Sequence, residues 1–94
     1  MEIIKNNESF SLKDNNGTYE MSGNISRDLS GSLNIHFNVN TLDGERVGDG
    51  HYNKYGENGE VNFGVNCVES KRDELTIYAD TVIDSVLEYI STLQ

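Results

Sequence analysis

Residues 31–40, GSLNIHFNVN, alternate between apolar and polar side chains with a period of two. Successive side chains of a β-strand point to opposite faces of the sheet, so this pattern predicts a strand with one buried face and one face in water. Asparagine is depleted in strands, so an amide-rich face needs an explanation. The apolar parity consists of Leu33, Ile35, Phe37 and Val39, and the polar parity of Asn34, His36, Asn38 and Asn40.

Turn sequences divide the first two thirds of the chain into five segments of this kind. They are DNNG at 14–17, LSG at 29–31, LDG at 42–44 and ENG at 57–59, which suit tight hairpin turns. Their regular spacing predicts an antiparallel meander over about residues 9–68, with strands at 9–13, 18–27, 32–41, 47–55 and 60–68. The parity predicts one shared apolar face made of Tyr19, Met21, Ile25, Leu33, Ile35, Phe37, Val39, Tyr52, Val61, Phe63, Val65 and Cys67.

The apolar period changes to three and four residues after Ser70, which predicts an amphipathic helix over about residues 71–93. Ser70 and Asp73 have the spacing of a capping box. An apolar helix stripe and an apolar sheet face bury each other. The chain is therefore predicted to be one α+β domain over 1–94, a four- to five-stranded antiparallel β-meander with one C-terminal α-helix packed on its apolar face. The stripe consists of Leu75, Ala79, Val82, Val86, Ile90 and Leu93.

Charge and cysteine content limit the classes of partner. Sixteen acidic and seven basic residues give a formal net charge of −9, which disfavours direct binding to nucleic acid or to an anionic membrane and favours a basic protein partner. Cys67 is the sole cysteine, so no internal disulfide forms, and we expect a reducing, cytoplasmic location. We also expect no signal peptide and no membrane span, because no apolar run is long enough.

The outward face of the predicted helix is the main candidate for partner binding. At about 100° per residue, four acidic residues fall within roughly 40° of the point opposite the core, and an isoleucine falls among them. Like charges four residues apart destabilise a helix slightly. An apolar anchor with a charged rim is typical of a protein interface, although a solvated helix face with one isolated isoleucine has the same pattern. The candidate residues are Asp73, Ile77, Asp80, Asp84 and Glu88.

The polar face of the predicted sheet is an alternative candidate, for a small ligand. Amides and imidazoles both donate and accept hydrogen bonds and could bind a sugar, a nucleotide or a peptide, although an uncovered sheet face is also polar simply because it is wet. A weak repeat aligns residues 31–39 with 59–67 and puts Gly64 where His36 stands; duplication and convergent strand patterning explain it equally well. The candidate residues are Asn34, His36, Asn38, His51, Asn62 and Asn66.

Catalytic and metal-binding patterns are weak. His36, His51 and Asp49 lack the spacing of a zinc signature, and the segment at 43–50 lacks the ligand order of a calcium loop. No order of serine or cysteine with histidine indicates a nucleophile. We therefore predict no enzymatic activity, no catalytic residue, no metal and no cofactor.

These observations predict a small acidic protein-binding module. Its size and charge suit a phage or mobile-element inhibitor that blocks the cationic nucleic-acid-binding surface of a host defence nuclease, of the anti-CRISPR or anti-restriction type; this is an analogy of size and charge alone. One alternative is a ligand-binding domain that uses the polar sheet face. Another is an immunity or structural protein that acts as a homodimer through an edge strand or the helix.

Overall fold

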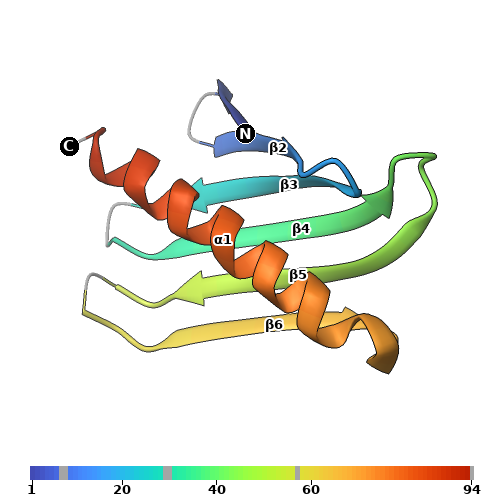
Figure 1. Ribbon diagram of the computed structural model, residues 1–94. Helices are drawn as coiled ribbons and strands as arrows, with labels where there is room; N and C mark the ends of the chain where they lie inside the picture. Colours follow the sequence, from blue (N-terminus) through green and yellow to red (C-terminus); the bar gives the residue numbers. More distant parts are fainter. Residues whose placement is uncertain (7–8, 29–30, 57, 94) are drawn as a thin grey trace.

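The computed structural model describes residues 1–6, 9–28, 31–56 and 58–93. Within them it contains one six-stranded antiparallel sheet, whose strands lie in sequence order, and one C-terminal helix across one face of that sheet (Figure 1). The elements are β1 (Glu2–Asn6), β2 (Ser9–Asn15), β3 (Tyr19–Arg27), β4 (Leu33–Thr41), β5 (Arg46–Lys54), β6 (Val61–Cys67), the 3₁₀ turn η1 (Glu69–Lys71) and α1 (Arg72–Ser91).

The predicted α+β class with an antiparallel meander and a C-terminal helix is confirmed, but the predicted number of strands is too low. The missed strand is β1, which pairs with β2 at the edge of the sheet. Its sequence, EIIKN, does not alternate, and Ile4 is 49% exposed on the face opposite the helix. The loop between β1 and β2 contains no glycine. Neither the period nor a turn signal therefore marked β1 as a strand.

The predicted parity of the middle strands is confirmed by their register. Ile25 pairs with Ile35, Ile35 with Tyr52, and Tyr52 with Phe63, so one row of apolar side chains crosses four strands on the helix face. A bulge interrupts this register, because Val39 pairs with Gly48 while Asn40 pairs with Arg46. Bulges locally increase strand twist. On the other parity, Asn34 and Asn38 of β4 share the opposite face with polar residues of β3, β5 and β6.

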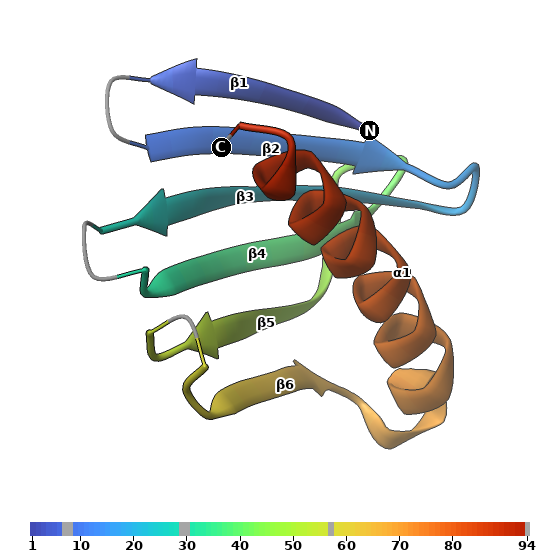
Figure 2. The ribbon, with the colours of Figure 1, turned by 90° about the vertical axis from the view of Figure 1, so that its left-hand side faces the viewer.

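Helix α1 lies diagonally across the apolar face, from the end of β6 to a position over β2 (Figures 1 and 2). At its start, a side chain at Gly48 would lie 3.1 Å from Leu75. At its end, the rings of Phe10 and Tyr89 pack edge to face with centroids 6.2 Å apart. The buried core lies between the sheet and α1. It comprises Phe10, Leu12, Tyr19, Met21, Ile25, Leu33, Ile35, Phe37, Val39, Leu75, Tyr78, Ala79, Val82, Ile83, Val86 and Ile90.

The predicted capping box at Ser70 is wrong. Ser70 lies within η1, α1 begins after Lys71, and none of the described side chains caps the first turn of α1. A tertiary contact holds this end instead: Tyr19 donates a hydrogen bond to Glu74 Oε2 (2.9 Å) and accepts one from Lys71 Nζ (3.1 Å). That hydrogen bond is the main cause that raises the pKa of Lys71. The start of the helix is thus fixed by β3.

Two residues of the predicted core are exposed. Val61 has the predicted parity, but 52% of it is exposed because the diagonal helix leaves that corner of the sheet uncovered. Leu93 follows the end of α1, which stops at Ser91 rather than near residue 93, and it is 42% exposed. The predicted stripe therefore loses its last member.

Candidate functional site

All five residues predicted for partner binding lie on the solvent side of α1, and we call them the acidic face. Their position follows from the helical period, because Leu75, Ala79, Val82 and Val86 point at the sheet and are buried. Ile77 is 67% exposed, although isoleucine is among the residue types that are most often buried. The acidic face consists of Asp73, Ile77, Asp80, Asp84 and Glu88, each exposed.

The carboxylates of the acidic face have little local compensation. Asp73 lies 3.6 Å from Arg72, which also contacts Glu69 at 3.3 Å. Asp80, Asp84 and Glu88 form no ion pair within the part of the chain that the structure describes. At 1.5 Å per residue, these three follow one another about every 6 Å along the axis. The result is a row of free negative charge on a rigid support.

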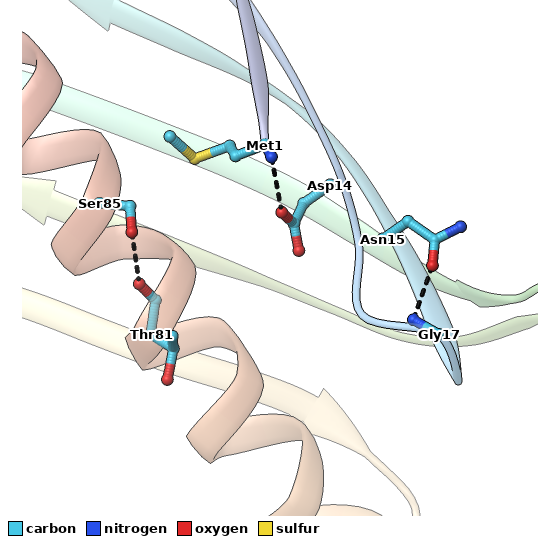
Figure 3. A network of polar contacts seen from close by, with 6 residues as sticks. All are labelled: Met1, Asp14, Asn15, Gly17, Thr81 and Ser85. Atoms are coloured by element: carbon cyan, nitrogen blue, oxygen red, sulfur yellow. Dashed lines mark hydrogen bonds and ion pairs between the residues drawn. The ribbon is translucent and has the colours of Figure 1, made fainter.

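Small side chains flank this row on one side. Thr81 donates a hydrogen bond to the carbonyl of Ile77 (2.9 Å), and Ser85 donates one to the carbonyl of Thr81 (3.3 Å; Figure 3). Their hydroxyls are thereby turned back onto the helix backbone. A shallow hollow of about 370 Å³ lies beside the N-terminal end of the acidic face. It is lined by Arg72, Asp73, Thr76 and Ile77.

The negative charge of one residue of the acidic face, Asp84, affects the pKa of a tyrosine in the sheet. Burial is the larger cause that raises the pKa of Tyr52, and the negative charge of Asp84 raises it further. Tyr52 is half-buried on β5, in the row that ends at Phe63. The carboxylate of Asp84, although exposed, therefore acts electrostatically on a half-buried tyrosine of β5.

The six residues of the alternative site lie together on the opposite face of the sheet, and we call them the asparagine face. Asn24, His36, His51 and Gly64 form one row across β3–β6. Another row, one pleat away, contains Ser22, Asn38, Asp49 and Asn66. No described element covers this face (Figure 2). The asparagine face consists of Asn34, His36, Asn38, His51, Asn62 and Asn66.

Side chains on the asparagine face bond mainly to one another. His51 Nε2 donates to the Asn62 amide oxygen (2.9 Å), and the Asn66 amide nitrogen donates to Asp49 Oδ1 (3.0 Å). The His51 ring lies over Gly64, where a Cβ would be 3.1 Å from its Cε1. That contact explains why glycine suits the position equivalent to His36. None of the six residues lines the hollow of about 700 Å³ described below, although that hollow is lined by Ser22 and Asn40 on the same side of the sheet.

The weak metal hypothesis gains no geometric support. His36 and His51 are directly opposite one another on β4 and β5. Asp49 instead forms an ion pair with Arg46. Among the described residues, no group of three or more histidine, cysteine, aspartate or glutamate side chains could hold a metal ion.

A hollow that sequence reasoning missed lies at the end of β1, β2 and β3. It encloses about 700 Å³ and depends on β1, the unpredicted strand. Next to it, Asp14 Oδ1 lies 3.4 Å from the amino group of Met1, and Asn15 accepts a hydrogen bond from the Gly17 amide (2.7 Å; Figure 3). Its lining mixes both charges, which indicates no particular ligand: Met1, Glu2, Lys13, Asp14, Asn15, Glu20, Met21, Ser22 and Asn40.

Comparison of the chain with models of protein families, with curated proteins and with solved structures gives no match. Among the described residues, no helix is both long enough and apolar enough to span a membrane.

Proposed function

We propose that this chain is an acidic protein-binding module, and that its partner presents a basic surface made to hold nucleic acid. The observation that carries the proposal is the row Asp80, Asp84 and Glu88, which is exposed on α1 beside the exposed Ile77 and forms no ion pair with any residue that the structure describes. Lysine and arginine side chains that neutralise phosphates would pair equally with these carboxylates. Binding would then exclude the nucleic acid by competition.

Folding alone does not account for the acidic face. Like charges at positions 80, 84 and 88 each cost a few tenths of a kcal/mol, and Glu88 lies near the helix end that favours cations. Ile77 contributes no burial to the core. A helix selected for stability alone would carry lysines at some of these positions, so a role in recognition is the better explanation.

The acidic face suits both rapid and specific association. A row of carboxylates about 6 Å apart steers a basic partner and raises the association rate. Ile77 supplies the apolar anchor that a charged rim needs for desolvation. We place the module in the cytoplasm as an inhibitor of the phage or mobile-element type, whose target is a defence nuclease.

Charge reversal on the acidic face tests this proposal. The partner is first captured from host lysate at low salt, identified and purified, and its binding to labelled DNA is measured with and without the module. The wild-type module should displace the DNA, and Asp80→Lys/Asp84→Lys should weaken this inhibition at least tenfold through slower association. A captured partner that still binds DNA when saturated with the module would contradict the proposal.

The control variant has the same net charge as Asp80→Lys/Asp84→Lys. Asp43→Lys/Glu60→Lys changes the net charge by the same amount, from −9 to −5, at exposed positions outside α1. It should retain most of the inhibition. Equal loss in both double variants would show that total charge acts, and that the acidic face has no special role.

A further inference from the structure

The two edge strands of the sheet differ in how they are protected from pairing. Edge strands of native proteins usually carry charges, prolines or bulges that prevent association with another strand. β1 has five residues and carries Glu2 and Lys5. β6 has seven, VNFGVNC, with no charge and no proline, and its register with β5 is unbroken from Val61 to Cys67. β6 is therefore an unprotected edge.

The sequence of β6 is nearly symmetric about its central residue. Phe63 and Val65 flank Gly64 on either side, and Asn62 and Asn66 follow them. Residues directly opposite each other in antiparallel strands lie on the same face of the sheet. Two copies of β6 paired with Gly64 facing Gly64 would thus place Phe63 opposite Val65 and Asn62 opposite Asn66. Amides would meet amides on one face, and apolar side chains would meet on the other.

The same arrangement covers the apolar corner that α1 leaves open. Val61 is 52% exposed and Phe63 is half-buried, since the helix lies over β6 only near the C-terminal end of that strand (Figure 2). Pairing centred on Gly64 puts Val61 opposite Cys67 of the second copy, next to the start of the helix in that copy. Each copy would therefore cover the open corner of the other, which is the self-complementarity that a two-fold interface requires.

We propose that this chain forms a homodimer by antiparallel pairing of β6 with β6 of a second copy, about a two-fold axis at Gly64. The interface is separate from the acidic face and does not depend on the proposed function. A net charge of −9 on each copy opposes association, but β6 itself is uncharged. Salt should therefore strengthen the dimer by screening this repulsion, whereas it should weaken binding of a basic partner to the acidic face.

Charge swaps across the axis test the predicted register. Asn62→Lys/Asn66→Lys places lysine opposite lysine twice, although it reduces the net negative charge of each copy from −9 to −7. Asn62→Asp/Asn66→Lys places opposite charges in the same positions and keeps the net charge at −9. Both sites are exposed. Sedimentation at several salt concentrations should give a dimer Kd about tenfold higher for the first variant than for the second.

A disulfide provides a second measurement that does not depend on charge. Val61→Cys would lie opposite Cys67 of the other copy, with Cα atoms about 4.5–5.5 Å apart, which a disulfide can bridge. Within one copy the two positions are six residues apart on a strand, about 20 Å, so only a covalent dimer can form. Mild oxidation should give that dimer rapidly. Ile4→Cys, on the other edge strand, is the control and should crosslink far more slowly.

The outcomes separate clearly. Dimers that tighten with salt, respond to the charge swap and crosslink through Val61→Cys support the proposal. A protein that stays monomeric at hundreds of micromolar in high salt overturns it. So does a dimer whose Kd is the same in both charge variants and which crosslinks no faster through Val61→Cys than through the control.

Discussion

The two faces of the sheet share one backbone and differ in almost everything else. On β4, Phe37 is 2% exposed under the helix, while the next residue, Asn38, is exposed on the asparagine face. Both residues take part in the same two strand ladders. The ladder is therefore common to the two faces, and burial of apolar area distinguishes them. Stability should depend on the covered face, and the asparagine face should tolerate change.

Glycines show the same contrast on the two faces. Gly50 lies on the covered face, where a Cβ would come within 2.4 Å of the Phe37 ring. Gly64 lies on the asparagine face, where the described atom nearest to a Cβ would be Cε1 of the His51 ring, at 3.1 Å. The first contact is fixed by the packed core, whereas the second involves a partly exposed side chain that can move. Space is therefore more restricted at Gly50 than at Gly64.

The largest expected effect comes from truncation on the covered face. Phe37→Ala should lower the free energy of unfolding by about 3–5 kcal/mol, because it removes a buried ring and leaves a cavity. Asn38→Ala, the neighbour on the same strand, should change it by no more than about 0.5 kcal/mol. Urea unfolding of both variants measures the difference. Similar losses would mean that the asparagine face also carries stability.

Glycine substitution should give a smaller difference in the same direction. Gly50→Ala should cost about 1–3 kcal/mol, since the added methyl group overpacks the Phe37 ring. Gly64→Ala should stay within about 0.5 kcal/mol, since His51 can rotate away. Thermal unfolding of the pair provides the comparison, and a large loss at Gly64 would contradict the mobility of His51.

Alkaline pH should lower the free energy of unfolding through Tyr78, which is buried between α1 and the covered face of the sheet. Burial is the largest cause that raises the pKa of its hydroxyl, and the neighbouring Asp14 and Glu20 carboxylates raise it further. The tyrosine of the unfolded chain loses its proton near pH 10, while Tyr78 of the folded chain keeps it. The contribution of Tyr78 to the free energy of unfolding is therefore fully present below about pH 10 and is lost as the pH rises further.

Tyr78→Phe removes this titration and keeps the ring. Its free energy of unfolding at neutral pH should stay within about 1 kcal/mol of that of the wild type, because the buried ring is kept. Its decline between about pH 9 and 11 should be shallower. Urea unfolding across that range is the measurement, and a decline as steep as that of the wild type would exclude Tyr78 as a cause.

The smallest effect is expected for the hydrogen bonds of the asparagine face. His51→Ala removes the bond to Asn62, which is exposed to water. Loss of such a bond should cost less than about 1 kcal/mol, because water replaces the partner. Denaturant unfolding of His51→Ala beside Asn38→Ala would show whether the face behaves uniformly. A loss above about 2 kcal/mol would make His51 structural.

Local periodicity determined the parity of β4, the apolar face, the identity of α1 and the outward position of the acidic face. Each depends on which side of one element a residue occupies, and that is set by a period of 2.0 or 3.6 residues. Asn34 and His36 on one face, and Ile77 on the exposed side of α1, follow directly from it.

Tertiary packing decided the rest. β1 exists because β2 offers it an edge, although its own sequence does not alternate. The start of α1 depends on Tyr19, more than fifty residues earlier in the chain. The exposure of Val61 depends on the angle at which α1 crosses the sheet. These features arise from contacts between elements, and a local period carries no information about the distance or angle between them.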